Sequence, residues 1–220
     1  MKVPLIQEAV LERLREQLVD GTFPPGAHIN ISEVADDLGV SIVPVREAVK
    51  ILQSEGRLVR DRSRSYRVRE LTYDELIQMN QLSSYLEIGL IEAGVPNLTD
   101  DEIAEMRDLN DLVAKREGDR HEILAAHRRL HFVCFEAANK SIYLENVNRL
   151  WDHYEHYRLL FFDSDSTIET DASVEHLEFV EACANRDVKQ AVMIHERHRL
   201  NSFSFLSTLA GQDQKERSGT

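Results

Sequence analysis

Histidines are the residues of this chain whose types and spacing most directly suggest chemistry. Of nine histidines in 220 residues, seven lie between His127 and His198. His127 and His131 are four residues apart, so both side chains lie on one face if that segment is helical. His176 and His198 fall on later segments that can approach that face. Imidazole commonly binds zinc, nickel, copper or iron. The residues alone leave two interpretations open, a transition-metal site or ordinary polar histidines.

A neighbouring pattern raises an enzyme as an alternative. The run His195-Glu196-Arg197-His198 is one residue shorter than the His-Glu-x-x-His signature of zinc proteases. A metal-dependent hydrolase built on the same histidines therefore stays open as the second interpretation. No nucleophile elbow, serine-triad order or phosphate-binding glycine loop supports it.

A basic stretch precedes the histidines. Between Arg57 and Arg69 there are six arginines and one aspartate. Their near-alternation around residues 66–68 favours a two-stranded ribbon, or wing, with basic residues on its open side. Net charge is −13 overall, but residues 1–70 hold 11 basic and 11 acidic residues, so the excess acidity belongs to residues 71–220. Local patches govern docking on phosphates, and the total charge therefore does not exclude DNA binding.

The segment before the wing has the pattern of a helix-turn-helix. Ser41 is placed to cap a helix, its hydroxyl accepting from free backbone N–H groups, and Pro44 falls in the first turn. Val45, Val49 and Leu52 recur at helical spacing and are expected to face inward, while Arg46 and Lys50 face outward. Such a helix is expected to enter the major groove of DNA.

The remaining pattern predicts a mainly α protein in two domains. Residues 1–70 are expected to form a winged helix-turn-helix domain, residues 71–210 an all-α antiparallel six-helix bundle, and residues 211–220 a flexible tail. Helices are predicted at residues 3–19, 31–38, 72–93, 99–117, 120–138, 141–162, 171–184 and 187–209. The helix at 99–117 is expected to open with a capping box formed by Thr99 and Glu102. No apolar run approaches the ~20 residues of a membrane span, and no signal peptide is expected, because residues 1–10 contain charges and no apolar region. Cys134 and Cys183 are isolated, as in a cytoplasmic protein with reduced thiols.

Residues 5–70 contain three short motifs, in the order GTFPPG at 21–26, PVREA at 44–48 and EG at 55–56. With these motifs the segment resembles the DNA-binding domain of the GntR family of bacterial transcription regulators. The expected DNA contacts are Ser32, Ser41, Val43, Arg46, Lys50, Arg62, Ser63 and Arg64. The family usually has Ser-Arg-Thr-Pro at residues 41–44, where this chain has Ser-Ile-Val-Pro, and a glycine near Ser65. The missing arginine leaves a third interpretation open, an interaction module whose DNA-binding function has decayed.

Weaker motifs continue along the second domain: Leu130-His131, Ala137-Ala138-Asn139, Glu175-His176, Asn185-Arg186-Asp187, Ala191 and His198. Over residues 72–209 the chain resembles the FCD ligand-sensing domain of the FadR subfamily, in its six-helix VanR-like variant. This resemblance implies a homodimer on a near-palindromic double-stranded DNA operator and a small-molecule effector. Repression is the expected mode of action, although the sequence does not distinguish it from activation.

The same resemblance implies a metal ion in the bundle, held by an aspartate four residues before one histidine and by two later histidines. His131, His176 and His198 match the histidine positions, and His127 stands where the aspartate would be. We expect these four to hold one divalent transition metal, zinc or nickel. A neutral imidazole in place of a carboxylate leaves the site one charge unit more positive, which favours an anionic effector such as a small carboxylate.

Effector contacts are expected around this centre. Asn80, Ser83 and Glu87 share one face of the first long helix of the bundle, although the family often has an arginine where Ser83 stands. The candidate effector-binding residues are Asn80, Ser83, Arg128, Tyr154, Arg158 and His195. His195 lies three residues before His198 and could also replace it as a ligand. The histidines without a family counterpart, expected to be structural or pocket-lining, are His121, His153 and His156.

Overall fold

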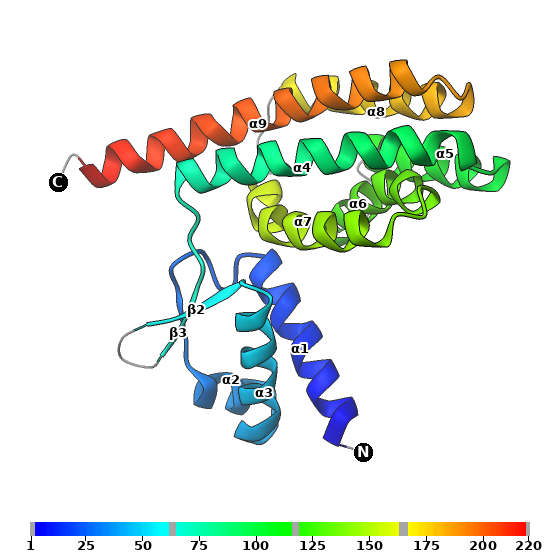
Figure 1. Cartoon of the computed structure of the whole chain (residues 1–220). Helices are drawn as coiled ribbons and strands as arrows, with labels where there is room; N and C mark the ends of the chain where they lie inside the picture. Colours follow the sequence, from blue (N-terminus) through cyan, green and yellow to red (C-terminus); the bar gives the residue numbers. More distant parts are fainter. Residues whose placement is uncertain (1–2, 62–64, 116–118, 163–166, 219–220) are drawn as a thin grey trace. The chain divides into compact units, whose positions relative to one another are not determined.

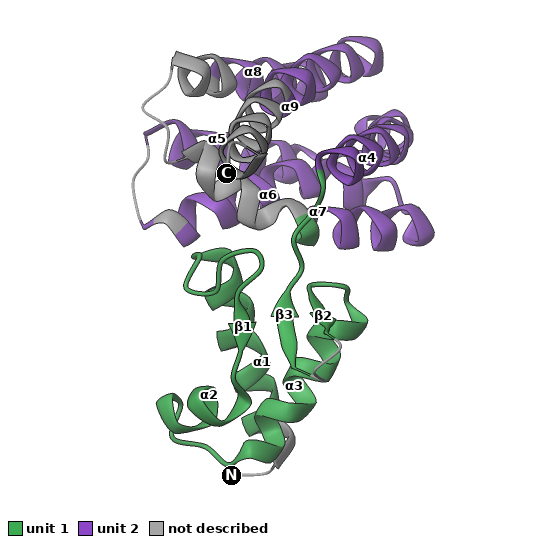
Figure 2. Ribbon diagram, turned by 90° about the vertical axis from the view of Figure 1, so that its left-hand side faces the viewer, with its two compact units in different colours: residues 1–72, 152–156 green, residues 73–151, 157–220 purple. Residues whose placement is uncertain are grey.

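The computed structural model describes residues 3–61, 65–115, 119–162 and 167–218, with side chains described for 6–61, 65–115, 119, 121–153 and 174–203. The chain forms two compact units (Figure 2). One contains residues 1–72 and 152–156, and the other contains residues 73–151 and 157–220.

The first unit is the predicted winged helix-turn-helix (Figure 1). Its elements are α1 (Val3–Val19), β1 (His28–Ile29), α2 (Ile31–Asp37), α3 (Ile42–Ser54), β2 (Leu58–Arg60) and β3 (Tyr66–Val68). The helices α2 and α3 form the helix-turn-helix, and the antiparallel pair β2 and β3 forms the wing, with Val59 opposite Arg67. β1 was not predicted, because a strand of two residues is too short to show alternation; it pairs with the other side of β3.

Helix α3 packs through the face that its periodicity predicts. Val45, Val49 and Leu52 are fully buried, in one core with Leu14 of α1. The turn between α2 and α3 places Gly39 at φ +64°, a conformation that glycine adopts without steric cost. This packing fixes α3 from its inner side only, so its outer face is left to solvent.

The predicted cap of α3 is wrong in one detail. Ser41 is the N-cap residue, but its side chain makes no capping hydrogen bond. An N-cap hydroxyl normally accepts from the N–H of the second or third helical residue. The third residue here is Pro44, which has no N–H to donate. The prediction counted Pro44 as favourable for the first turn and overlooked the donor that it removes.

The second unit contains the six predicted α-helices, except for residues 152–156, and within the described residues no strand. They are α4 (Tyr73–Gly94), α5 (Asp100–Lys115), α6 (Arg120–Ala137), α7 (Ser141–Phe162), α8 (Thr167–Ala184) and α9 (Val188–Ser218), with a 3-10 turn η1 (Val95–Asn97) after α4. α4 packs on α6 and α9, and α8 packs on α5 and α9. The predicted mainly α fold is confirmed.

Helix ends differ from the predicted ones in two places, and the first is the start of α8 at Thr167 instead of residue 171. α9 continues to Ser218 instead of ending near residue 209, so most of the predicted tail is helical. The residues after Gly211 include glutamine, lysine, glutamate and arginine, which favour helices. At α5 the expected capping box is present: the Thr99 N–H donates to Glu102 at 2.7 Å, and the Glu102 N–H donates to Thr99 Oγ1 at 3.2 Å.

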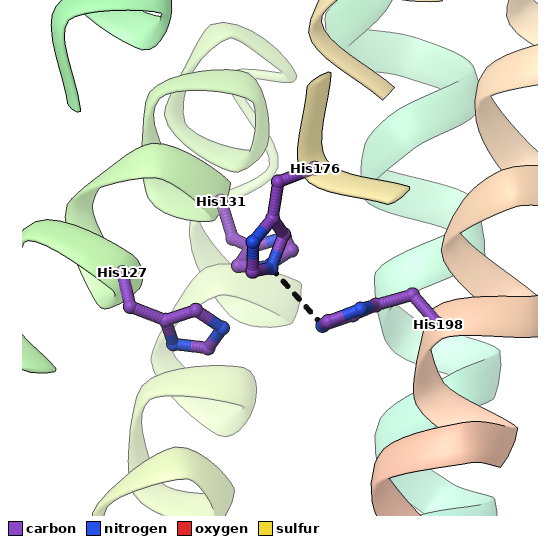
Figure 3. Close-up of side chains that lie close together, drawn as sticks. All are labelled: His127, His131, His176 and His198. Carbon is purple, nitrogen blue, oxygen red and sulfur yellow. Dashed lines mark hydrogen bonds between the residues drawn. The ribbon is translucent and has the colours of Figure 1, made fainter. Parts of the chain in front are cut away.

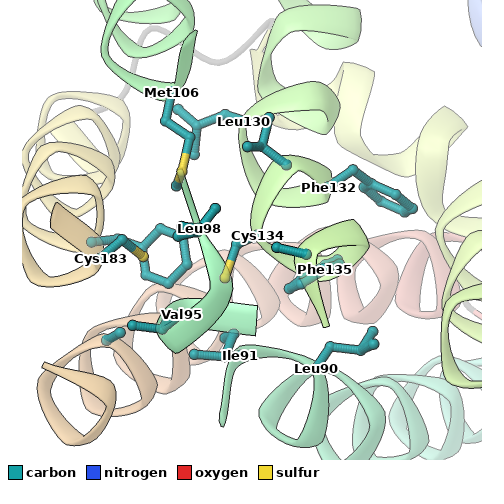
Figure 4. Close-up of a cluster of buried hydrophobic side chains, with 14 of the residues drawn as sticks. Leu90, Ile91, Val95, Leu98, Met106, Leu130, Phe132, Cys134, Phe135 and Cys183 are labelled. Atoms are coloured by element: carbon teal, nitrogen blue, oxygen red, sulfur yellow. The ribbon is translucent and has the colours of Figure 1, made fainter. Parts of the chain in front are cut away.

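The apolar core of the second unit brings α4, α6 and α8 together (Figure 4). Gly94 lies so close to α6 that an added Cβ would be 2.0 Å from the Cys134 carbonyl oxygen, so only glycine permits this approach. Cys134 and Cys183 are both buried free thiols. A hydrogen bond between them, together with burial, raises the pKa of the Cys134 thiol. In the part of the chain that is described, no helix is long and apolar enough to span a bilayer.

Candidate metal centre and nucleic-acid interface

Four buried histidines meet in the interior of the second unit (Figure 3). α6 contributes His127 and His131, α8 contributes His176, and α9 contributes His198. One ring nitrogen from each lies within 4.8 Å of the corresponding nitrogens of the other three. The Nε2 atoms of His176 and His198 are 3.2 Å apart. The structure thus brings together the four side chains that the sequence analysis selected.

This arrangement fits a transition-metal ion. Four nitrogens at ~2.0–2.1 Å from a tetrahedral zinc ion lie roughly 3.3 Å from one another, so small side-chain movements would close the present spacing. The Nδ1 atoms of His131 and His176 are buried and have no hydrogen-bond partner among the described residues. Buried polar atoms are rarely left unsatisfied unless they serve a ligand or water.

The protonation of these rings also suits metal binding. Burial, followed by the neighbouring histidines, lowers the pKa of His131 well below its ordinary value. The same two causes lower the pKa of His176. Both rings are therefore neutral near pH 7, and a neutral imidazole has the lone pair that a metal requires.

Glu175 orients one of the four histidines, a role that the sequence analysis missed. Its Oε2 accepts from His198 Nδ1 at 3.2 Å, while Oε1 accepts from Arg197 Nε at 3.0 Å and Asn201 Nδ2 at 2.7 Å. Burial works to raise the pKa of Glu175, but the His198 and Arg197 contacts outweigh it and lower the pKa. An ionised carboxylate only accepts, so His198 carries its proton on Nδ1 and turns the Nε2 lone pair toward His176.

Glu87 of α4 is at the centre of a second group of buried polar side chains. The Glu87 side chain itself has no solvent exposure. The carboxylate accepts from Trp151 Nε1 at 2.7 Å and from His195 Nε2 at 2.7 Å, and also from Ser83 and Arg199. Burial favours the neutral acid, yet Arg199 and His195 hold the pKa of Glu87 far below its usual range. Glu87 is therefore a buried carboxylate that is fully supplied with donors.

Three of the predicted effector contacts, His195, Ser83 and Asn80, are engaged in this group around Glu87. His195 donates to Glu87 and is not a member of the four-histidine group, so it does not replace His198. Ser83 donates to the same carboxylate. Asn80 accepts twice from Arg199 Nη2, at 2.6 Å through its backbone and side-chain oxygens. Arg199 carried no sequence signal and was missed.

Of the remaining predicted effector contacts, the structure describes the side chain of Arg128 alone. Arg128 donates to Asn148 at 2.8 Å and lies over the Phe132 ring, 4.8 Å from its centroid. The side chains of Tyr154 and Arg158 lie outside the described residues.

The predicted DNA-contacting side chains of the helix-turn-helix are exposed. Ser41, Val43, Arg46 and Lys50 lie on the outer side of α3, and Ser32 lies at the start of α2. Lys50 pairs with Glu47 at 2.7 Å across one helical turn. Arg46 makes no ion pair or hydrogen bond with the described residues, which leaves its guanidinium available for an external partner.

The wing is less uniformly basic than the sequence analysis expected. Arg60 and Arg67 are exposed, and Arg60 lies over the Tyr66 ring at 5.7 Å. The Arg57 side chain is only 9% exposed and lies beside Glu55, so it is not part of an open basic face. The wing-tip residues Arg62, Ser63 and Arg64 lie outside the described residues.

Two family models match the sequence. Residues 6–68 match "Bacterial regulatory proteins, gntR family", and residues 78–201 match "FCD domain". Both ranges agree with the two resemblances drawn from the motifs. These are families of regulators, and the hydrolase alternative gains no support from them.

Individual proteins that are similar to this chain are also transcriptional regulators. The transcriptional regulator McbR of Escherichia coli is 31% identical over 140 residues, covering 63% of this chain and 63% of McbR. A probable D-xylose utilization operon transcriptional repressor of Paenarthrobacter nicotinovorans is 29% identical over 177 residues, covering 80% of this chain and 77% of that protein. The solved structure of E. coli McbR/YncC superposes with a TM-score of 0.81 at 23% identity, covering 93% of this chain and 98% of that one, which shows a shared fold.

Proposed function

This chain belongs to the GntR family of bacterial regulatory proteins and carries an FCD domain, and from that membership we propose a DNA-binding transcriptional regulator that senses a small organic acid through a bound divalent transition metal. The observation that carries the sensing part is the set of four buried histidines within 4.8 Å of one another in the matched FCD segment. The exposed outer face of α3 carries the DNA-binding part.

We assign DNA binding to residues 1–70, and effector binding and dimerisation to residues 71–210. One recognition helix reads only a few base pairs, so specific binding requires two copies on a near-palindromic operator. Repression is the proposed mode of action, in line with the name of the Paenarthrobacter relative. Sedimentation of the full chain should give a dimer. A 25.3 kDa monomer, both free and on DNA, would refute the dimer.

His127, His131, His176 and His198 are the proposed ligands, with zinc or nickel as the preferred ion. A bound ion would supply a Lewis acid for an anionic effector. The four imidazoles are uncharged ligands, and the two nearby carboxylates are already paired, Glu87 with Arg199 and Glu175 with Arg197. The charge of the ion is therefore left for the effector to compensate, which favours a carboxylate over a neutral molecule.

Elemental analysis tests the metal. Protein purified without a histidine tag or chelating resin should contain close to one equivalent of zinc, nickel or a related ion. His131→Ala and His176→Ala should lower metal content and melting temperature together. His121→Ala, at an exposed histidine of the same helix α6, is the matched control and should change neither. Less than a tenth of an equivalent, with no thermal shift on adding any of these ions, would reject the site.

A thermal-shift screen tests the effector. Small mono-, di- and tricarboxylates should raise the melting temperature of metal-loaded protein, because a ligand that binds only the folded state stabilises it. After removal of the metal by a chelator the same acids should give no shift. A neutral amide analogue of an active acid is the control. An equal shift by acid and amide would contradict coordination of the effector by the metal.

A further inference from the structure

The tip of the recognition helix has an unusual apolar surface. Ile42 and Val43 are the first two residues of α3, with 42% and 59% of their surface exposed. The motif to which residues 41–44 are similar usually has arginine and threonine at these places. We propose that Ile42 and Val43 recognise thymine through its 5-methyl group, so that the operator carries thymine where an arginine would select guanine. This inference rests on the proposed DNA-binding function and specifies the bases it reads.

Internal packing does not explain these two side chains. The buried residues of the first turns are Pro44, Val45 and Ala48, and of these Val45 and Ala48 belong to the apolar core of the unit. Ile42 and Val43 lie outside that core. β-Branched residues are also less favourable than most in a helix, so helix formation does not account for them. Two adjacent exposed apolar side chains at the start of a recognition helix are better explained by an external apolar partner.

The position of the pair suits base reading. The N-terminal residues of a recognition helix are the ones that approach base edges in the major groove. Thymine presents its methyl group there, and cytosine has no methyl at that position. A β-branched side chain is restricted at χ1, so its methyl groups are presented in few directions. Val43 and Ile42 therefore form a preorganised apolar surface at the right end of α3.

The neighbouring polar groups complete a reading surface. Arg46 is three residues after Val43 and four after Ile42, on the same side of α3, and its guanidinium is available. The Ser41 side chain makes no capping hydrogen bond, so its hydroxyl is available for a phosphate or a base edge. An apolar surface flanked by these donors matches DNA better than it matches an apolar protein groove.

Uracil substitution provides the test, because deoxyuridine differs from thymidine only by the methyl group. Full-length protein would first select its preferred duplex from a randomised double-stranded DNA pool. Each thymine of that duplex is then replaced singly by deoxyuridine. At one or two positions per half-site the affinity should fall about three- to fivefold, the effect of one buried methyl group. Ile42→Ala with Val43→Ala should reduce that discrimination to less than twofold at the same positions.

A matched control comes from the other unit. Val174 and Leu177 of α8 have similar exposure, 55% and 48%, and Val174→Ala with Leu177→Ala should keep the full thymine preference. Wild-type protein that tolerates uracil at every position, or equal discrimination by the Ile42/Val43 double variant, would overturn the inference while leaving DNA binding intact. Failure to select any duplex, with an affinity equal to that for unrelated DNA, would instead overturn the proposed function itself, and the apolar tip would then point to a protein partner.

Discussion

The outer face of α3 and the interior of the helical unit both contain polar side chains, but these side chains are held in different ways. On α3, Arg46 has no partner among the described residues, and Lys50 has only a surface pair with Glu47. In the interior, Glu87 alone accepts from four side chains contributed by α4, α7 and α9. The exposed face can change its sequence at little cost to the fold, whereas each interior group is fixed by the others.

The strongest test of this difference is Glu87→Ala. Removing the carboxylate leaves the buried His195 and the largely buried Arg199 without the charge that both donate to, and breaking one side of a buried charge pair costs about 3–5 kcal/mol. Urea denaturation monitored by circular dichroism measures the change in the free energy of unfolding. The control is Glu178→Ala, which removes a half-exposed carboxylate paired with Arg197 and should cost less than about 0.5 kcal/mol. Equal losses in the two variants would show that the interior network is not coupled as described.

Arg46→Ala is the corresponding change on the exposed face. It should weaken binding to the selected duplex by about 1–3 kcal/mol if the guanidinium reads a base, and leave the free energy of unfolding unchanged. Fluorescence anisotropy with labelled DNA measures the affinity. Arg13→Ala is the control, because Arg13 is an exposed arginine of the same unit that pairs with Glu16 on α1. A loss of stability comparable to the loss of affinity would remove the contrast between the two regions.

A smaller effect is expected at the residue that orients His198. Glu175→Gln retains size and hydrogen bonding but loses the charge that holds the His198 proton on Nδ1, and such changes beside metal ligands weaken affinity about tenfold or more. Competition with a chromophoric chelator measures zinc affinity directly. Glu178→Gln is the control, since Glu178 shares Arg197 with Glu175 but does not touch a histidine. An unchanged affinity in Glu175→Gln would assign Glu175 to packing alone.

The most gradual effect is that of pH on the metal-free protein. The folded state holds the pKa of His131 and of His176 below the ordinary value of 6.5, so unfolding allows these rings to take up protons. The unfolded state therefore binds more protons, and stability is present above about pH 6.5 and is lost as the pH falls below it. Melting temperatures from pH 7.5 to 5 measure this loss. His131→Ala with His176→Ala should flatten the profile, and an unchanged slope would contradict the assignment.

Whether interacting residues lie close together in the sequence decides which features of the structure could be predicted. The recognition helix, the wing and the capping box at Thr99 rest on residues within a few positions of one another, and these predictions were confirmed. The pair His127 and His131 was also a local pattern. The prediction that the Ser41 side chain caps α3 was wrong, because the third helical residue is Pro44, which has no N–H to donate. This error also concerns residues close together in the sequence, and counting the N–H donors of the first helical turn would have avoided it.

What could not be predicted depends on pairing across the chain. Glu87 and Arg199 are 112 residues apart, and nothing in either neighbourhood indicates that they meet. The strand at His28 exists only because β3 lies beside it. The approach of His176 and His198 to His131 was expected from a family resemblance, because spacing alone left a polar core as the alternative. Buried charges whose ion-pair partner is distant in the sequence, such as Glu87, are the residues for which the sequence gives least warning.

Trp151 makes the four-histidine group accessible to fluorescence measurements. It is the single tryptophan of the chain, 2% exposed, and its indole N–H donates to Glu87. Its ring centroid lies 5.4 Å from that of His131 and 5.9 Å from that of His127. All intrinsic indole emission therefore originates beside the four histidines, without background from a second fluorophore of that type. Quenching by nickel or copper, and a spectral shift on addition of an acid, would report occupancy of the centre in the unlabelled protein.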